Sequence, residues 1–399
     1  MIILNNIKSN YSRDLKLNSF KKFEKVFKDI VKNISHQNNI LNVLNKNFKF
    51  SFKKDEIKKF KKFKKIVLIG MGGSILGTEA IYSFLKHKIK KKVYFFDDLD
   101  EKEISKIKKK EILSQMLFII ISKSGNTIET LSNAFSLNIF KRNAKNLIII
   151  TEKKDNLLFR LSKKLNLFYV KHKNYIGGRY SVLSDVGILP SYLMGLNILK
   201  LRSKLLEFIK GNNKKTLRES SIYLSHFLNT KKKNNLIFLN YTPELENLLF
   251  WCQQLIAESL GKKNKGFLPI ISKAPKDHHS LLQLYLEGPK DKIFYIFSAE
   301  TKAKVKININ KSLDKKNYLN KKFIRSIKEA QKNALIKTLK KNKIPFREFK
   351  IKNLDEKTIG MFFSYFILET ICIGKLSNIN PFNQPAVEQV KKFTKQLLN

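Results

Sequence analysis

The sequence predicts an α/β protein with two units, each holding a mainly parallel, doubly wound sheet covered by helices. Three observations lead to this fold class. Short apolar runs rich in β-branched residues alternate with helical stretches, as expected of parallel strands buried on both faces. Clusters of glycine and hydroxyl residues follow several of these runs, where ligands bind in such sheets. With 399 residues, the chain is long enough for two domains, each with its own core.

The first unit is assigned to residues 61–200. It follows a segment, residues 1–60, that is expected to form helices with a polar face and that ends near a lysine-rich run at Lys53–Lys65. A helix at Leu76–Leu85 is expected after the first strand. The strands of this unit are expected at Ile66–Ile69, Val93–Phe96, Leu117–Ile121, Leu147–Ile150 and Leu167–Val170.

The second unit is assigned to residues 201–379, and a terminal helix to residues 380–399. The alternation of strands and helices again favours a sheet with right-handed crossovers. Its strands are expected at Leu236–Leu239, Ile293–Phe297, Val305–Ile309 and Phe346–Phe349. Its main helices are expected at Pro243–Leu260, Phe323–Lys341 and Ile359–Ile373.

The chain carries a large positive charge, formally +48, from 80 Lys and Arg against 32 Asp and Glu. Such an excess is typical of nucleic-acid or anionic-membrane binding. However, the lysines are spread along the whole length and accompany abundant Asn and Ile, which indicates a compositional bias and not one binding patch. We therefore expect no nucleic-acid partner, although the charge should attract phosphorylated metabolites.

The two cysteines, Cys252 and Cys372, lie far apart within helical patterns, which indicates buried free thiols and no disulfide framework. The N-terminal apolar run, Met1–Leu4, is too short for a signal peptide and charged residues follow it. No stretch approaches the roughly 18 apolar residues of a spanning helix. A cytoplasmic protein without a membrane partner is expected.

Three hydroxyl residues gather around one glycine after the apolar run at Leu117–Ile121. Ser122, Ser124 and Thr127 directly precede a helical stripe that starts at Ile128. Hydroxyls and free backbone N–H groups at a helix N-terminus bind anions, and a phosphate is the natural occupant. An ordinary N-cap is the alternative, but a cap needs only one of these hydroxyls.

A glycine-rich turn, Gly70–Gly77, follows the first strand. A dinucleotide fingerprint would need glycine at Ile75, and a P-loop would need lysine at Thr78. Asp97 and Asp98 at the next strand end keep a dinucleotide site open as an alternative. We interpret the turn as a close approach of the backbone to a ligand, with Ser74 offering a hydroxyl. A purely structural turn is the other alternative.

Two further segments supply charged groups. Arg179 follows Gly177 and Gly178, and its planar fork of donors suits an oxyanion. Its alternative is a surface salt bridge. Glu258 lies four residues after Gln254, on the same face of an apolar helix, and is a candidate general base. Its alternative is a solvated helical glutamate.

The last candidates lie in the C-terminal half. His278 and His279 form a pair for which we favour a proton-transfer role, because no Cys or acidic residues gather at a spacing suited to a metal. Lys391, in the terminal helix, could present an ammonium to a ligand. Most lysines of this chain only solvate the surface, which is its alternative.

Taken together, these segments resemble the phosphoglucose isomerase family, in its short bacterial form. Ser122–Thr130 alone resembles the wider superfamily of sugar isomerase (SIS) domains, which includes glucosamine-phosphate synthases and sugar-responsive regulators. Gly177–Ser184, Glu258–Lys262 and Asn380–Lys391 resemble the isomerases specifically. The segments occur in the order of the family and cover roughly residues 66–395.

The resemblance implies two sugar-isomerase-type α-β-α sandwich domains and a homodimer whose active site is shared between subunits. It implies an aldose–ketose isomerase of glycolysis and gluconeogenesis that interconverts glucose 6-phosphate and fructose 6-phosphate through an enediolate. It also implies no cofactor and no metal. The expected partners are a small sugar phosphate and the second subunit, without nucleic acid.

The matching motifs imply a role for each site residue. Glu258 should carry a proton between carbons 1 and 2, and Arg179 should stabilise the resulting anion. His279, entering from the neighbouring subunit, and Lys391 should assist ring opening. The residues implied to bind the substrate are Gly73, Ser74, Ser122, Lys123, Ser124, Thr127, Gln254 and Gln384.

The chain departs from the family pattern at two places. Ala386 stands where glycine is usual, and His278 stands where an apolar residue is common, so the choice between His278 and His279 rests on motif alignment. Two rival functions stay open: a related isomerase acting on mannose 6-phosphate or an amino sugar, and a non-catalytic sugar-phosphate sensor that binds nucleic acid. A sensor would need neither Glu258 nor Arg179.

Overall fold

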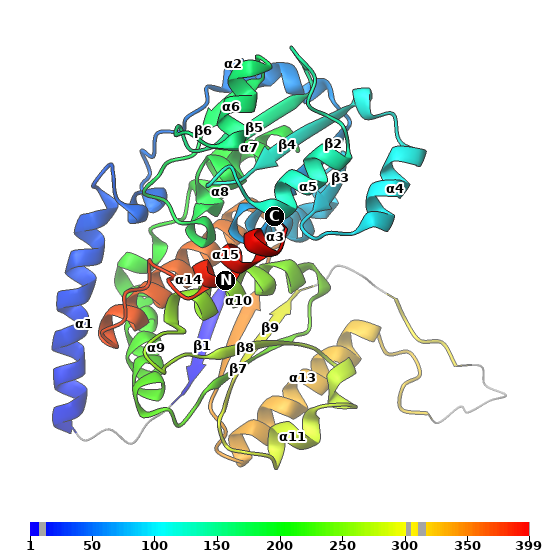
Figure 1. Ribbon diagram of the computed structural model, residues 1–399. Coiled ribbons are helices and arrows are strands. Elements are labelled where there is room, and N and C mark those ends of the chain that lie inside the picture. Colours follow the sequence, from blue (N-terminus) through cyan, green and yellow to red (C-terminus); the bar gives the residue numbers. More distant parts are fainter. Residues whose placement is uncertain (8–12, 301–304, 310–316, 399) are drawn as a thin grey trace.

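The protein forms two five-stranded sheets with a layer of helices between them and further helices on their outer faces (Figure 1). The computed structural model describes residues 1–7, 13–300, 305–309 and 317–398. Both sheets are mainly parallel, so the predicted α/β fold class is confirmed.

The first sheet is entirely parallel and has the strand order β3-β2-β4-β5-β6. The sequence predicted each of these strands to within one residue at either end, because their continuous apolar runs are typical of a buried parallel sheet. The strands are β2 (Lys65–Gly70), β3 (Lys92–Phe96), β4 (Met116–Ile121), β5 (Leu147–Thr151) and β6 (Phe168–Lys171).

Successive side chains of a strand point to opposite faces of a sheet, so alternate residues of this sheet pack into two different cores. Val67 and Ile120 pack into an outer core with the helices that cover one face. Ile66 and Ile119 pack into a second core that continues into the other unit. The helices of this half of the chain are α1 (Arg13–Ile34), α2 (Lys54–Lys58), α3 (Leu76–Leu85), α4 (Glu101–Lys110), α5 (Ile128–Ser136), α6 (Leu157–Lys164), α7 (Asp185–Leu193) and α8 (Ile198–Arg202). The shorter 3-10 turns used below are η1 (Ile40–Leu44), η3 (Gly72–Ser74) and η6 (Gly178–Leu183).

The second sheet has the order β1-β10-β9-β7-β8, with only β1 antiparallel to its neighbour. Its strands are β1 (Ile2–Asn6), β7 (Asn235–Asn240), β8 (Leu268–Lys273), β9 (Lys292–Ala299) and β10 (Phe346–Ile351). The start of the chain thus completes the sheet of its second half. Arg347 of β10 fixes this pairing, since its Nε donates to Asn5 Oδ1 at 2.8 Å and its guanidinium pairs with the buried Glu369.

Three sequence expectations differ from this sheet. The predicted strand Val305–Ile309 is wrong, because in the described part of that segment Lys306 makes only an isolated bridge to Phe323. Strand β1 was missed because residues 1–60 were expected to be helical. Strand β8 was missed because it contains Pro269, which cannot donate to a sheet; β8 lies at a sheet edge, where proline is tolerated.

The second half of the chain supplies most of the helices between the two sheets. Its helices are α9 (Gly211–Thr230), α10 (Glu246–Leu260), α11 (Leu282–Leu286), α13 (Ile324–Lys341), α14 (Glu356–Leu376) and α15 (Val387–Leu397). Helix α10 packs against α3 and α14, which ties the two units together. Within the described residues, α14 is apolar and long enough to cross a membrane, but most of it is buried in this central layer, as in a core helix of a folded protein.

Candidate active site

Two loops leave the same edge of the first sheet at its topological switch point. Gly70 at the end of β2 lies beside Ile121 at the end of β4. The chain continues from β2 to β3 on one side and from β4 to β5 on the other. Open α/β sheets bind ligands where the strand order reverses in this way. The loops that follow β2 and β4 are the predicted glycine turn and the predicted phosphate site.

The glycine turn is packed against backbone. Gly72 has a φ of +51°, and a Cβ there would lie 2.7 Å from Gln254 Nε2. A Cβ on Gly73 would lie 2.2 Å from the carbonyl carbon of Gly178. The glycines therefore allow the loop after β2 to touch α10 and η6, which brings the predicted Arg179 segment to the glycine turn.

The hydroxyls of the predicted phosphate site converge. Ser122 Oγ lies 2.8 Å from Thr127 Oγ1 and accepts the backbone N–H of Gly125 at 3.1 Å. Ser124 Oγ lies 3.4 Å from Thr127 Oγ1. Gly125 has a φ of +69°, which closes the turn before α5 begins. The three hydroxyls cluster beside the first turn of α5, an arrangement suited to a phosphate.

Lys123 turns its side chain to a neighbouring loop. Its Nζ donates to the carbonyl of Asn174 at 2.8 Å and lies 3.6 Å from Glu152 Oε1. Burial lowers the pKa of this ammonium, while the nearby Glu152 opposes the shift. The structure therefore places the backbone of Lys123, but not a free ammonium, among the predicted substrate-binding residues.

The predicted base, Glu258, is held at both carboxylate oxygens. Gln254 Nε2 donates to Oε1 at 2.9 Å, and Arg179 donates to Oε2 at 3.1 Å. Residues four apart on α10 share a face, which gives the contact between Gln254 and Glu258. The Oε1 atom of Gln254 is buried without a hydrogen-bond partner in the described structure. A ligand hydroxyl could therefore donate to Gln254 at this point.

Arg179 is buried and every one of its donors is used. Its Nε donates to Ser259 Oγ at 2.8 Å, and one terminal nitrogen donates to both Glu258 and Gln384. The other terminal nitrogen donates to the carbonyls of Pro381 at 2.7 Å and Asn383 at 3.1 Å. A guanidinium has five N–H donors, so a bound oxyanion would have to replace one of these partners.

Three residues that received no role from the sequence complete this network. Tyr180 Oη contacts Ser259 Oγ at 2.9 Å and donates to Pro381 O at 2.9 Å. Lys262 Nζ donates to Ser259 O at 3.0 Å and to Asn380 O at 2.8 Å. All three lie inside the quoted motifs, next to residues that were assigned, and this adjacency was the signal that could have identified them.

The environment of Lys262 changes its acidity. Burial, and then the charge of Arg179, lower the pKa of Lys262 to about 8, against the opposing effect of Glu258. Together with Arg179 and Tyr180, Lys262 binds the backbone carbonyls of the loop at residues 380–383. We call this loop the carbonyl loop. It leads to Gln384, so the network sets where that amide lies.

The two histidines have different surroundings. Tyr241 Oη lies 2.7 Å from His278 Nε2, and burial lowers the pKa of His278. His279 is exposed and makes no side-chain hydrogen bond within the described residues. His278 is therefore held by Tyr241 within the same chain, whereas His279 lies at the surface.

Lys391 lies on the exposed helix α15, where its Nζ pairs with Glu388 Oε1 at 2.7 Å. The pair is on the solvent side of a helix with no buried residue. The structure therefore does not bring Lys391 to Glu258, although Gln384, three residues before α15, does contact Arg179. Among the described residues, no cluster of His, Cys, Asp and Glu side chains is arranged to hold a metal ion.

Comparisons with known proteins agree on one family. The family model described as phosphoglucose isomerase matches residues 21–269. A glucose-6-phosphate isomerase of Methanocaldococcus jannaschii is 33% identical, over 86% of this chain and 86% of that protein. A glucose-6-phosphate isomerase of Campylobacter jejuni is 31% identical, over 90% of each chain.

Solved structures share the fold. A glucose-6-phosphate isomerase from Chlamydia trachomatis superposes with a TM-score of 0.79 at 16% identity, over 99% of this chain and 88% of that one. A hypothetical protein from Thermus thermophilus superposes with a TM-score of 0.81 at 21% identity, over 100% and 99%. At these identities the likeness concerns the fold alone, and it covers both sheets.

Proposed function

Because the chain belongs to the phosphoglucose isomerase family, it is an enzyme that interconverts glucose 6-phosphate and fructose 6-phosphate, and we propose that Glu258 carries the proton in this reaction. In the open-chain aldose, Glu258 takes the proton from carbon 2, and the electron pair forms the double bond of an enediolate. The same carboxyl then returns the proton to carbon 1, while the hydroxyl proton of oxygen 2 passes to oxygen 1, and the carbonyl is left at carbon 2. One carboxylate thus acts as base and as acid.

The single observation that supports this role is the way Glu258 is held. Gln254 and Arg179 each bind one carboxylate oxygen, so the side chain is fixed in one orientation before substrate arrives. Such preorganisation lowers the cost of reaching the reactive geometry. The unpartnered Oε1 of Gln254 is suited to accept a substrate hydroxyl beside this carboxylate.

Arg179 stabilises the enediolate in this proposal by exchanging a partner. One of its terminal nitrogens donates to Glu258 and Gln384, both of which are side chains. The other donors bind Ser259 and the carbonyl loop. A substrate oxygen that becomes negatively charged would therefore replace Gln384 most readily, because the amide can rotate while the loop stays in place.

In this proposal the phosphate binds at the hydroxyl cluster after β4. Ser122, Ser124 and Thr127 supply hydroxyls, and the backbone of Lys123 and the first turn of α5 supply N–H groups. Gly73 and Ser74 approach from the turn after β2, whose end is paired with the end of β4. These residues fix one end of the sugar, so that carbons 1 and 2 reach Glu258.

His279 and Lys391 assist ring opening in this proposal. His279 is exposed and free of local partners, which is the state expected of a residue that acts in a second subunit. We therefore propose a homodimer in which each His279 enters the neighbouring site. Lys391 would have to leave Glu388 and approach the site as α15 repacks.

The remaining assignments complete the proposal. Residues 61–200 and 201–379 form the bulk of the two sugar isomerase domains, and strand β1 of the preceding segment, residues 1–60, completes the sheet of the second one. A terminal segment at residues 380–399 follows. The enzyme uses no cofactor. It works in the cytoplasm, in glycolysis and gluconeogenesis, and it has no nucleic-acid or membrane partner.

A coupled assay tests the proposal. Purified protein is given fructose 6-phosphate in the presence of a chelator, and formation of glucose 6-phosphate is followed. We expect turnover that the chelator does not change, and loss of turnover in Glu258→Gln. A preference for mannose 6-phosphate, or turnover that survives the loss of Glu258, would overturn the proposal.

A further inference from the structure

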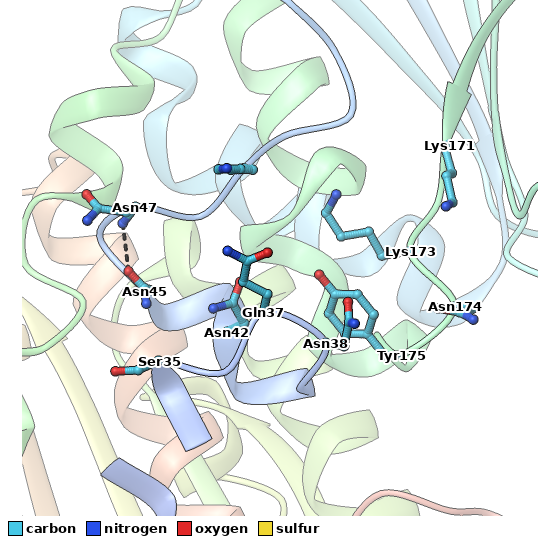
Figure 2. A pocket seen from close by; sticks show the side chains of 11 residues that line it. Ser35, Gln37, Asn38, Asn42, Asn45, Asn47, Lys171, Lys173, Asn174 and Tyr175 are labelled. Carbon is cyan, nitrogen blue, oxygen red and sulfur yellow. Dashed lines mark hydrogen bonds between the residues drawn. The ribbon is translucent and has the colours of Figure 1, made fainter. Parts of the chain in front are cut away.

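A pocket of about 490 Å³ lies between the turn that follows α1 and the segment that follows β6 (Figure 2). None of the residues that received a role in isomerisation lines it. We call it the amide–lysine pocket, after its side chains. Its lining residues are Ser35, Gln37, Asn38, Asn42, Asn45, Asn47, Lys49, Lys171, Lys173, Asn174 and Tyr175.

The charged side chains that line the amide–lysine pocket are all of one sign. Three lysines line it, and no Asp or Glu does. The buried Asp185, which accepts the backbone N–H of Ser51, does not line the pocket but attracts the Lys173 ammonium. Lys49 and Lys171 make no ion pair within the described part of the chain, and Lys173 donates to a neutral partner, Ser51 Oγ, at 3.2 Å. The ammonium groups of Lys49 and Lys171, which lack carboxylate partners, focus a positive potential into this concave surface.

The wall of the pocket is fixed by hydrogen bonds. The amides of Asn42 and Asn45 both donate to Ile34 O at 3.0 Å, and Arg202 donates to Asn45 O at 2.6 Å. By contrast, the side-chain amides of Gln37 and Asn38 make no hydrogen bond in the described structure and point to the cavity in Figure 2. The pocket is therefore preformed, with free donors at its mouth.

We propose that the amide–lysine pocket binds a small metabolite that carries two or more phosphate groups. Lysine ammonium and side-chain amide groups are donors suited to phosphate oxygens. The volume lies within the range of small-ligand sites, roughly 300–1,000 Å³. Several adjacent cations match a diphosphate or bisphosphate better than a single phosphate. Lys171 and Lys173 also lie at and just beyond the carboxyl end of β6, the sheet edge where such folds bind ligands.

The pocket is connected to the proposed isomerase site. A neighbouring pocket of about 410 Å³ shares Asn38, Asn174 and Tyr175 with it and is also lined by Lys123. The Lys123 ammonium donates to Asn174 O. The backbone of Lys123 belongs to the loop after β4 that carries the proposed phosphate-binding hydroxyls. A bound polyphosphate would therefore act on phosphate binding at the isomerase site. This consequence rests on the proposed function, whereas the binding itself does not.

Equilibrium dialysis with labelled pyrophosphate tests the binding. The measurement uses the whole protein at about 0.15 M salt, where weak surface attraction is screened, with saturating glucose 6-phosphate to occupy the isomerase site. We expect a single pyrophosphate to stay bound to each chain. Complete displacement by glucose 6-phosphate would mean that pyrophosphate binds only at the isomerase site, and the proposal would fall.

A pair of double variants separates a specific site from the general charge of the chain. Lys49→Gln with Lys171→Gln should raise the Kd of pyrophosphate at least about tenfold, as expected for lost charge-assisted bonds. Lys337→Gln with Lys341→Gln removes the same charge from the exposed face of α13 and should leave that Kd unchanged. An equal loss in both variants would show attraction by net charge and would overturn the proposal.

The melting temperature and the KM for fructose 6-phosphate of the first double variant test whether its loss of pyrophosphate binding is local. The lysines at positions 49 and 171 are exposed, so their double variant should keep the melting temperature of the parent protein. In the absence of pyrophosphate it should also keep the KM for fructose 6-phosphate. A loss of isomerase activity in that variant would place these lysines in the isomerase site and contradict a separate pocket.

Discussion

Glu258 and Arg179 lie among fixed partners inside the molecule, whereas His279 and Lys391 lie at its surface. Both oxygens of Glu258 and all donors of Arg179 are engaged within one chain. His279 has no local partner in the described structure, and Lys391 pairs only with the exposed Glu388. The centre proposed for proton transfer is therefore complete in a single chain, while the residues proposed for ring opening are not.

The difference indicates what each part needs for activity. Proton transfer at carbon demands a base in one orientation, and a buried network provides it. Ring opening, in our proposal, uses His279 and Lys391, whose final positions would be set by packing against a second subunit. Helix α15 supports this view, because several of its apolar side chains are exposed: Val387, Val390, Phe393 and Leu397. An amphipathic helix with an uncovered apolar face is suited to pack against another surface.

The largest effect is expected from removing the proposed base, Glu258. Glu258→Gln keeps the shape and the contact with Gln254 but removes the base, so kcat should fall at least about a hundredfold with little change in KM. Glu287→Gln is the matched control, since Glu287, at the C-terminal end of α11, also pairs with a glutamine four residues away, Gln283, but both side chains are exposed. Steady-state kinetics of both variants decide the point, and near-normal turnover in Glu258→Gln would remove Glu258 from the role.

The next effect concerns the fixed phosphate site. Thr127→Val removes one hydroxyl that should bind a charged phosphate, worth about 1.5–3 kcal/mol, so KM for fructose 6-phosphate should rise at least about tenfold. Thr130→Val, on the same helix, removes a buried hydroxyl that has no partner in the described structure. This control should change KM little. Equal KM values for the two variants would place the phosphate elsewhere.

A mixing experiment tests whether His279 acts across subunits. Glu258→Gln and His279→Ala should each be nearly inactive, because each lacks one component of every site. After unfolding and refolding together in equal amounts, random pairing should restore about a quarter of the wild-type activity, since each mixed dimer holds one complete site. A mixture that stays inactive, although size measurements show dimers, would confine His279 to its own subunit.

The smallest effect concerns the carbonyl loop. Burial and the charge of Arg179 lower the pKa of Lys262 to about 8. As the pH rises through this value, the Lys262 ammonium loses its proton, so kcat/KM should fall a few-fold. Lys262→Arg keeps the charge and should move this decline to higher pH. An unchanged alkaline profile in Lys262→Arg would assign the decline to another group.

Protein stability gives an independent check on the same residue. The folded pKa of Lys262 lies below its ordinary value of 10.5, so the unfolded chain binds more protons between these two values. The contribution of Lys262 to the free energy of unfolding therefore becomes more favourable as the pH rises from about 8 towards 10.5. Activity lost in that range together with an unchanged or higher melting temperature would exclude unfolding as the cause.

The sequence predicted the elements whose signals are local. The strands of the first sheet have continuous apolar runs, and their predicted ends agree with the structure. The hydroxyls after β4 and the contact between Gln254 and Glu258 followed from short spacings. Strand β1 could not be predicted in this way, because its partner is β10, more than 300 residues away.

Contacts within the candidate site also join residues far apart in the sequence, and these contacts could not be predicted from local patterns. The sequence placed Arg179 beside glycines but could not show that its donors are shared among Ser259, Glu258 and the carbonyl loop. These partners come from two segments, α10 and the carbonyl loop, which meet Arg179 only in the folded chain. The exposure of Lys391 likewise depends on where α15 packs, which no spacing within the helix reveals.

The pairing of β1 with β10 has a consequence for synthesis on the ribosome. All strands of the first sheet lie between residues 65 and 171, so that sheet can assemble while the rest of the chain is still being made. Residues 2–6 are made long before their partner strand, which ends at residue 351. They cannot take their place in the second sheet until β10 has emerged, so that sheet is completed only late in translation.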